Sequence, residues 1–125
     1  MLREMSPNRR WLWVAWCVTL VMVVIGSLLP GPWMARIQTS VFPASDKLVH
    51  FTGYCLLAAL PALGSRRRLE IVAFAAVAVL LGVVLEISQR LVPGRVVDLA
   101  DLGANNLGVF TGAALGWLLR SIFRL

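Results

Sequence analysis

Long runs of uncharged, mostly apolar residues constrain this chain more than any other feature. No Asp, Glu, Lys or Arg occurs in four stretches of the chain, residues 11–29, 51–64, 71–85 and 102–119. A helix that crosses a bilayer needs about 20 predominantly apolar residues. Hydrophobic residues make up 59% of the chain, whereas soluble domains usually contain about 45–50%. A soluble domain of 125 residues could not bury such runs, so the sequence predicts an integral membrane protein.

Helix-breaking residues divide these runs. Pro-Gly-Pro at residues 30–32 ends the first run, Gly-Ser at 64–65 ends the second, and Pro-Gly at 93–94 follows the third. The first run lacks a small-x-small cleavage site, so we predict an uncleaved helix, followed by a loop. The prediction is an all-α protein with one domain over residues 1–125. It forms a small bundle of four transmembrane helices, at about 11–29, 46–63, 69–91 and 99–119.

Basic residues at the helix ends predict the orientation. Four spans place both termini on one side, together with the loop at residues 66–68. That side holds Arg3, Arg9, Arg10, Arg66, Arg67, Arg68, Arg120 and Arg124, and the other holds Arg36, Lys47, Arg90 and Arg95. Loops rich in Lys and Arg stay in the cytoplasm, so we expect a multi-pass protein with both termini cytoplasmic. The net charge of +6 is then a topology signal, and we expect no nucleic-acid partner.

Polar residues gather at the opposite, extracytoplasmic ends of three predicted helices. Helical spacing predicts one shared face on each helix, with Asp46, His50 and Tyr54 on the first, Glu86 and Gln89 on the second, and Asp101 and Asn105 on the third. Ionisable side chains at membrane depth usually face the bundle interior and pair with one another. The predicted ligand-binding site comprises Asp46, Lys47, His50, Tyr54, Glu86, Gln89, Arg95, Asp98, Asp101 and Asn105.

Several of these residues also have structural explanations. Glu86 needs a partner among Lys47, His50, Arg90 and Arg95, and Arg95 is the first choice, because a guanidinium can hold two carboxylates or a phosphate. Asp98 could cap the last helix with Asp101 as its capping-box partner at the third position. Lys47 could extend its ammonium group to the membrane interface.

Residues 46–53 and 101–108 share a pattern that indicates an internal repeat. The first reads Asp-x-x-x-His-x-x-Gly and the second Asp-x-x-x-Asn-x-x-Gly. Such a repeat would place His50 and Asn105 as counterparts that face a shared axis.

Glycines recur at helical spacing along the last predicted helix, at Gly108, Gly112 and Gly116. They allow another helix to approach closely. The expected neighbour is a helix of the same bundle, and the same stripe is also the expected contact of a homo-oligomer.

The sequence offers little support for a metal site. Asp46, His50, Glu86 and Asp101 provide oxygen and nitrogen ligands, but the chain has one histidine. Its two cysteines lie inside apolar runs and belong to no Cys-x-x-Cys pair. We therefore expect no metal and no cofactor.

The ordered polar motifs resemble the VanZ-like membrane protein family, whose founding member is linked to teicoplanin resistance. The resemblance covers about residues 12–119 and implies a small helical protein of the bacterial cytoplasmic membrane. Glycopeptides bind cell-wall precursors outside that membrane, on the side predicted for the polar site. The resemblance rests on Asp46-Lys47-x-x-His50-x-x-x-Tyr54, Glu86-x-x-Gln89 and Arg95-x-x-Asp98-x-x-Asp101-x-x-x-Asn105-x-x-Gly108-x-x-x-Gly112.

Three functions are compatible with these features. The first is a non-catalytic envelope protein that binds an anionic lipid or a lipid-linked cell-wall intermediate, with an effect on teicoplanin susceptibility. The second is an enzyme that hydrolyses an envelope lipid, by metal assistance or with His50 and Glu86 as acid and base. The third is a small transporter, which the apolar inner half of the bundle disfavours. We expect the first.

Overall fold

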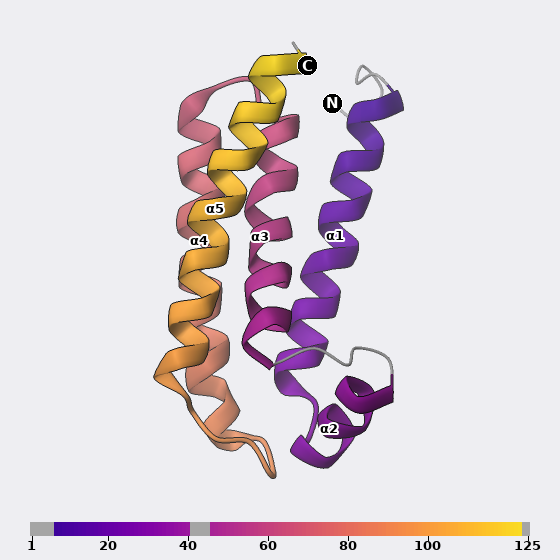
Figure 1. The fold of residues 1–125 in the computed structure, drawn as a ribbon, viewed down its shortest axis with the longest axis vertical. Helices are drawn as coiled ribbons and strands as arrows, with labels where there is room; N and C mark the ends of the chain where they lie inside the picture. Colours follow the sequence, from indigo (N-terminus) through magenta and orange to yellow (C-terminus); the bar gives the residue numbers. More distant parts are fainter. Residues whose placement is uncertain (1–6, 41–45, 124–125) are drawn as a thin grey trace.

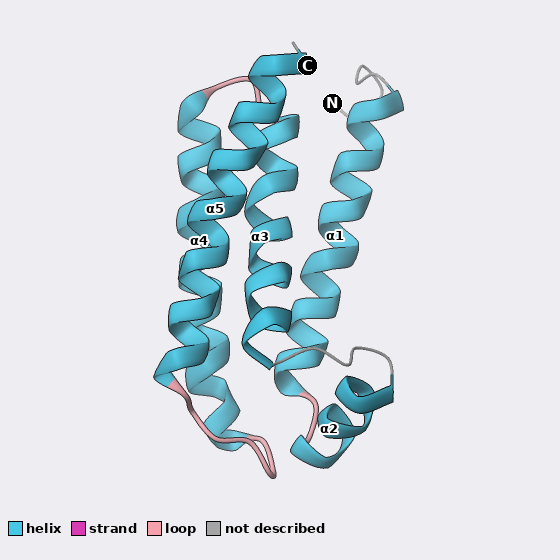
Figure 2. Ribbon diagram, viewed as in Figure 1, coloured by secondary structure: helices cyan, strands magenta, loops and turns pink. Residues whose placement is uncertain are grey.

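The computed structural model describes residues 7–40 and 46–123, and over these residues it is all-helical (Figures 1 and 2). A short 3-10 turn follows the fourth helix. The elements are α1 (Pro7–Leu28), α2 (Gly31–Ser40), α3 (Asp46–Gly64), α4 (Arg68–Ser88), the turn η2 (Gln89–Leu91) and α5 (Leu99–Phe123).

Within residues 7–40 and 46–123, three helices are long and apolar enough to cross a membrane, at Arg9–Leu28, Asp46–Gly64 and Arg68–Leu91. The predicted membrane protein is confirmed to that extent. The 25-residue α5 is not among them, because its first turns contain an aspartate and two asparagines and glycines recur along it. Large apolar side chains nevertheless cover its outer surface, with Phe110 66% and Ile122 62% exposed.

The predicted loop after the first helix is wrong, because residues Gly31–Ser40 form the short helix α2. Pro32 lies in the first turn of α2, where a missing N–H costs nothing because that N–H would have no helical partner. The same Pro-Gly-Pro that ends α1 therefore starts α2.

The two Pro-Gly turns contact each other. The N–H of Gly31 donates to the carbonyl of Pro93 over 3.0 Å, and a Cβ on Gly31 would lie 2.1 Å from the carbonyl oxygen of Gly94. Gly94 itself has a φ of +72°, a conformation that glycine adopts without steric cost. The turn between α1 and α2 is thus fixed against the turn that precedes α5.

Helices α3 and α5 run side by side in the same direction and form the most extensive contact of the bundle (Figure 1). A Cβ would lie 2.4 Å from the Phe51 carbonyl at Gly108, 2.0 Å from the Cys55 carbonyl at Gly112 and 2.5 Å from the Ala59 carbonyl at Gly116. The glycine stripe therefore serves packing within the bundle, as predicted. Since α3 covers these three glycines, a homo-oligomer would have to use another surface.

The other helices complete the bundle around α3. Trp16 of α1 donates from its indole nitrogen to the carbonyl of Leu57 over 3.1 Å, and its ring packs edge-on against Phe74 of α4. The buried core contains Tyr54, Leu57, Ala58, Ala78 and Val109. Helix α1 begins and α5 ends at the same end of the bundle, as Figure 1 shows. At that end Arg68 lies over the ring of Trp117.

Candidate functional site

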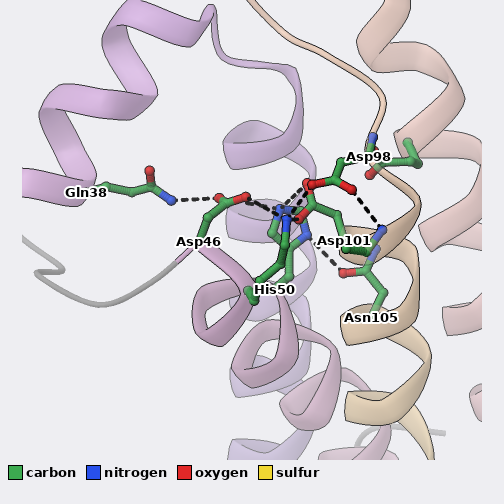
Figure 3. A network of polar contacts seen from close by, with 9 residues as sticks. Gln38, Asp46, His50, Asp98, Asp101 and Asn105 are labelled. Atoms are coloured by element: carbon green, nitrogen blue, oxygen red, sulfur yellow. Dashed lines mark hydrogen bonds and ion pairs between the residues drawn. The ribbon is translucent and has the colours of Figure 1, made fainter.

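The opposite end of the bundle brings together the first turns of α3 and α5 and the end of α4 (Figure 1). The backbone geometry explains this convergence, because α3 and α5 both start there and α4 arrives there antiparallel to them. Figure 3 shows side chains from α3 and α5 pointing toward one another, with α2 contributing from the side. We call this the polar cluster, and its contacting members are Gln38, Asp46, Lys47, His50, Glu86, Asp98, Asp101 and Asn105.

Lys47 joins α3 to α5. Its ammonium nitrogen donates to Oδ2 of Asp98 over 2.6 Å and also to Oδ1 of Asp101, and it lies 3.9 Å from Oδ2 of Asp46. The ammonium of Lys47, with the N–H of Ala100, holds the pKa of Asp98 below its usual value. The ammonium group of Lys47 is therefore paired with carboxylates of the cluster.

His50 is held by α5 on one side of its ring. Its Nδ1 lies 2.9 Å from Oδ1 of Asn105, its counterpart in the repeat pattern. An amide oxygen only accepts, so the hydrogen-bond network assigns the ring hydrogen to Nδ1 and leaves a lone pair on Nε2 of the neutral ring. That Nε2 lies 3.7 Å from Oδ1 of Asp46 and 3.7 Å from Oδ2 of Asp101.

Glu86 has a different partner from the expected one. Its side chain is 3% exposed, and Oε1 accepts the backbone N–H of Asp98 over 2.7 Å. Across the described residues, Glu86 and Arg95 form no ion pair. Arg95 lies in the turn before α5, and its backbone N–H donates to the carbonyl of Val92.

Asp98 caps α5, as predicted. Its Oδ1 accepts the N–H of Ala100 over 2.8 Å. The expected capping box with Asp101 does not form, because Asp101 turns to Lys47. The N–H of the cap residue is paired by Glu86 instead, so a carboxylate from another helix does what a third-position carboxylate does in a capping box.

Two further predicted site residues are buried. Tyr54 and Gln89 are each 2% exposed. Tyr54 belongs to the buried core, and α4 approaches it at Gly82, where a Cβ would lie 3.2 Å from its ring. Tyr54 therefore packs the helices together beneath the cluster.

Sequence reasoning missed Gln38 and Asn106. Gln38 donates from Nε2 to Oδ1 of Asp46 over 2.8 Å, but its segment reads as a loop in the sequence, so no helical face predicted the contact. Asn106 follows the predicted Asn105, and its Oδ1 is buried with no partner among the described residues. The double asparagine at the start of α5 was the available signal.

One group within the cluster has the composition of a metal site. Asp46, His50 and Asp101 each place one ligand atom so that all three atoms lie within 4.8 Å of one another. Glu86, which the sequence grouped with them, is not a member of this set.

The family described as VanZ/LLP1 matches residues 11–120 of the chain. No curated protein and no solved structure gives a significant match. The matched region runs from the first turns of α1 to the last turns of α5, and it confirms the resemblance that the ordered polar motifs predicted.

Proposed function

The chain belongs to the VanZ/LLP1 family, and from this membership we propose a protein of the bacterial cytoplasmic membrane with four spans and both termini cytoplasmic. The 25 residues of α5 exceed the length that a bilayer requires. Its glycines pack against the apolar α3, which is itself a candidate span. The arginine-rich end of the bundle supports the cytoplasmic placement of the termini.

The polar cluster would then lie at the extracytoplasmic face, where we propose that it binds an anionic lipid or a lipid-linked cell-wall intermediate. The supporting observation is the difference between the cations at this end. Lys47 is held by two carboxylates, whereas the structure gives Arg90 and Arg95 no carboxylate partner within residues 7–40 and 46–123. Arg90 is exposed and Arg95 is half-buried. A guanidinium matches the geometry of a phosphate and binds it with two hydrogen bonds.

The remaining members of the cluster form the frame for these arginines. Glu86 fixes the backbone of Asp98, three residues from Arg95, and Lys47 fixes the side chain of Asp98. In this proposal the arginines hold the phosphate, and Lys47 has a positioning role. A bound cell-wall intermediate would be less accessible to a glycopeptide, which is how such binding would change teicoplanin susceptibility.

The test is lipid binding by the full-length chain in nanodiscs. The probes are vesicle-derived phosphatidylglycerol, phosphatidylcholine and a polyprenyl diphosphate lipid, measured by native mass spectrometry. Arg95→Ala should lose retention of the two anionic lipids while the protein stays folded in the membrane. Arg66→Ala, at the opposite end of the bundle, is the matched control. Equal retention in wild type and Arg95→Ala would contradict the proposal.

Hydrolysis of such a lipid is the second candidate, and one observation favours it. The Nε2 atom of His50 carries a lone pair in the neutral ring and can accept a proton. Glu86 fits the role of the second acid–base group less well, because its carboxylate already accepts the N–H of Asp98. Turnover of a labelled lipid that is lost in His50→Ala would favour the enzyme, and no turnover across the same lipid panel would exclude it.

A further inference from the structure

We infer that Asp46, His50 and Asp101 form a site for one divalent metal ion of the zinc type. This inference concerns the interior of the polar cluster and does not depend on lipid binding by the arginines. Three independent features of the described residues lead to it. They are the spacing of the ligand atoms, the charge of the cluster, and the partner that each ligand has on its far side.

The spacing of the three ligand atoms fits a metal better than it fits direct hydrogen bonds. Nε2 of His50 lies 3.7 Å from a carboxylate oxygen of Asp46 and 3.7 Å from one of Asp101. Both distances exceed those of real hydrogen bonds. Zinc ligands with bonds of about 2.1 Å lie about 3.4 Å apart in a tetrahedron. Three lone-pair donors therefore surround a position that a small contraction of the side chains would make suitable for a cation.

The charges immediately around Lys47 leave room for two further positive charges. Among the described residues, the carboxylates of Asp46, Asp98 and Asp101 lie within ion-pair distance of the Lys47 ammonium. One ammonium against three carboxylates leaves two negative charges when His50 is neutral. Like charges at such short range are costly where water is partly excluded, and Asp101 is 6% exposed. A divalent cation would neutralise the set.

Each proposed ligand is oriented by a second residue. His50 gives its Nδ1 hydrogen to Asn105, Asp46 accepts from Gln38, and Asp101 accepts from Lys47 through the oxygen that does not face His50. Metal-binding histidines almost always donate their other N–H to an oxygen, and metal-binding carboxylates are themselves hydrogen-bonded.

Three protein ligands leave one position of a tetrahedral site open to water or an anionic oxygen. The side chain of Asp46 is 43% exposed, so this side of the site is accessible from outside the bundle. Imidazole favours zinc, copper, iron and nickel, whereas a purely carboxylate site favours magnesium and calcium. The mixed set therefore favours zinc over the alkaline-earth ions.

The test measures metal binding by the full-length chain in detergent micelles, purified through a tag without histidine. After removal of bound metal with a chelator, Zn²⁺ and Mg²⁺ are titrated separately by calorimetry, and bound Co²⁺ is followed by its visible absorption. We expect one Zn²⁺ per chain, a Co²⁺ spectrum of a tetrahedral nitrogen and oxygen site, and much weaker Mg²⁺ binding. Absence of Zn²⁺ binding by folded wild type would overturn the inference.

Substitutions distinguish specific Zn²⁺ binding at this site from adventitious binding elsewhere. His50→Ala and Asp101→Asn should each abolish Zn²⁺ binding, and Gln38→Ala should weaken it about 10- to 100-fold by releasing Asp46. Gln38→Ala leaves the contacts between α3 and α5 intact, so it keeps the test decisive if the other two variants misfold. Glu70→Gln, a carboxylate change at the opposite end of the bundle, is the control and should bind as wild type. Binding that His50→Ala and Gln38→Ala both leave unchanged would contradict the site.

The outcome is independent of the arginines. Arg95→Ala should bind Zn²⁺ as wild type does, even where it loses the anionic lipids. Loss of Zn²⁺ binding in Arg95→Ala would contradict the proposed metal site, whereas loss of lipid binding alone would leave it unaffected.

Discussion

The carboxylate of Glu86 accepts the backbone N–H of Asp98 over 2.7 Å, and this contact fixes the end of α4 to the cap of α5. Both groups lie where the chain turns from one helix to the next. The contact pairs a helix-start N–H that would otherwise need water or a neighbouring side chain. It also gives the buried Glu86 carboxylate a partner other than the arginine expected from the sequence.

Removal of this acceptor should destabilise the bundle. Glu86→Ala leaves the Asp98 N–H without its partner, at a cost of about 1–3 kcal/mol. Unfolding of the protein in mixed micelles by titration with a denaturing detergent measures the change. Glu86→Gln retains an oxygen that can accept the same hydrogen bond, so we expect it to lose less stability than Glu86→Ala does. An equal loss in both variants would show that the charge, and not the hydrogen bond, stabilises this turn.

Gly112 should tolerate no side chain. A Cβ there would lie 2.0 Å from the carbonyl oxygen of Cys55, so Gly112→Ala forces α3 and α5 apart. We expect the free energy of unfolding to fall by about 1–3 kcal/mol. Gly103→Ala is the matched control on the same helix, because among the described residues no atom of another helix lies within 4 Å of its Cβ position. Alanine in place of an unhindered helical glycine should raise stability by about 0.5–1 kcal/mol. The same unfolding measurement compares the two variants, and equal effects would contradict the close helix contact.

Acid should weaken the cluster through Asp98. The ammonium of Lys47 and the N–H of Ala100 hold the pKa of Asp98 below its usual value of 3.8. A carboxylate whose pKa is lower in the folded state adds stability above its unfolded pKa. That contribution is lost as the pH falls through the folded pKa. The melting temperature of wild type should therefore fall below about pH 4 more steeply than that of Asp98→Asn. Parallel curves for the two proteins would count against this role of Asp98.

The proposed orientation predicts which residues a membrane-impermeant thiol reagent reaches in intact cells. In a chain whose Cys17 and Cys55 are replaced by alanine, a cysteine at Leu91, which is 88% exposed, should react from outside. A cysteine at Arg66 should react only after the membrane is permeabilised. The reverse pattern would place both termini outside.

Much of the fold follows from the one-dimensional pattern. Runs of apolar residues of bilayer length predict helices because a lipid-facing backbone must satisfy its own hydrogen bonds. Helices α1, α3 and α4 follow this rule, and the helix spacing of the glycines correctly predicted a close helix contact. The short α2 escaped prediction because a Pro-Gly-Pro can end one helix and start the next, and ten residues give a weak periodic signal.

The membership of the polar cluster was largely visible in the sequence, since costly polar residues at the ends of apolar helices seldom lie there by chance. Pairing within the cluster depends on distances between helices, which the spacing along one helix does not contain. Charge complementarity favoured Arg95 for Glu86, and position in the first turn of the last helix favoured a capping role for Asp101. The bundle instead brought Lys47 to Asp101, the Asp98 backbone to Glu86, and Gln38 to Asp46. Composition and periodicity therefore determined that this chain is a helical membrane protein with polar helix ends, while the packing of α3 against α5 through glycine decided which of those polar groups meet.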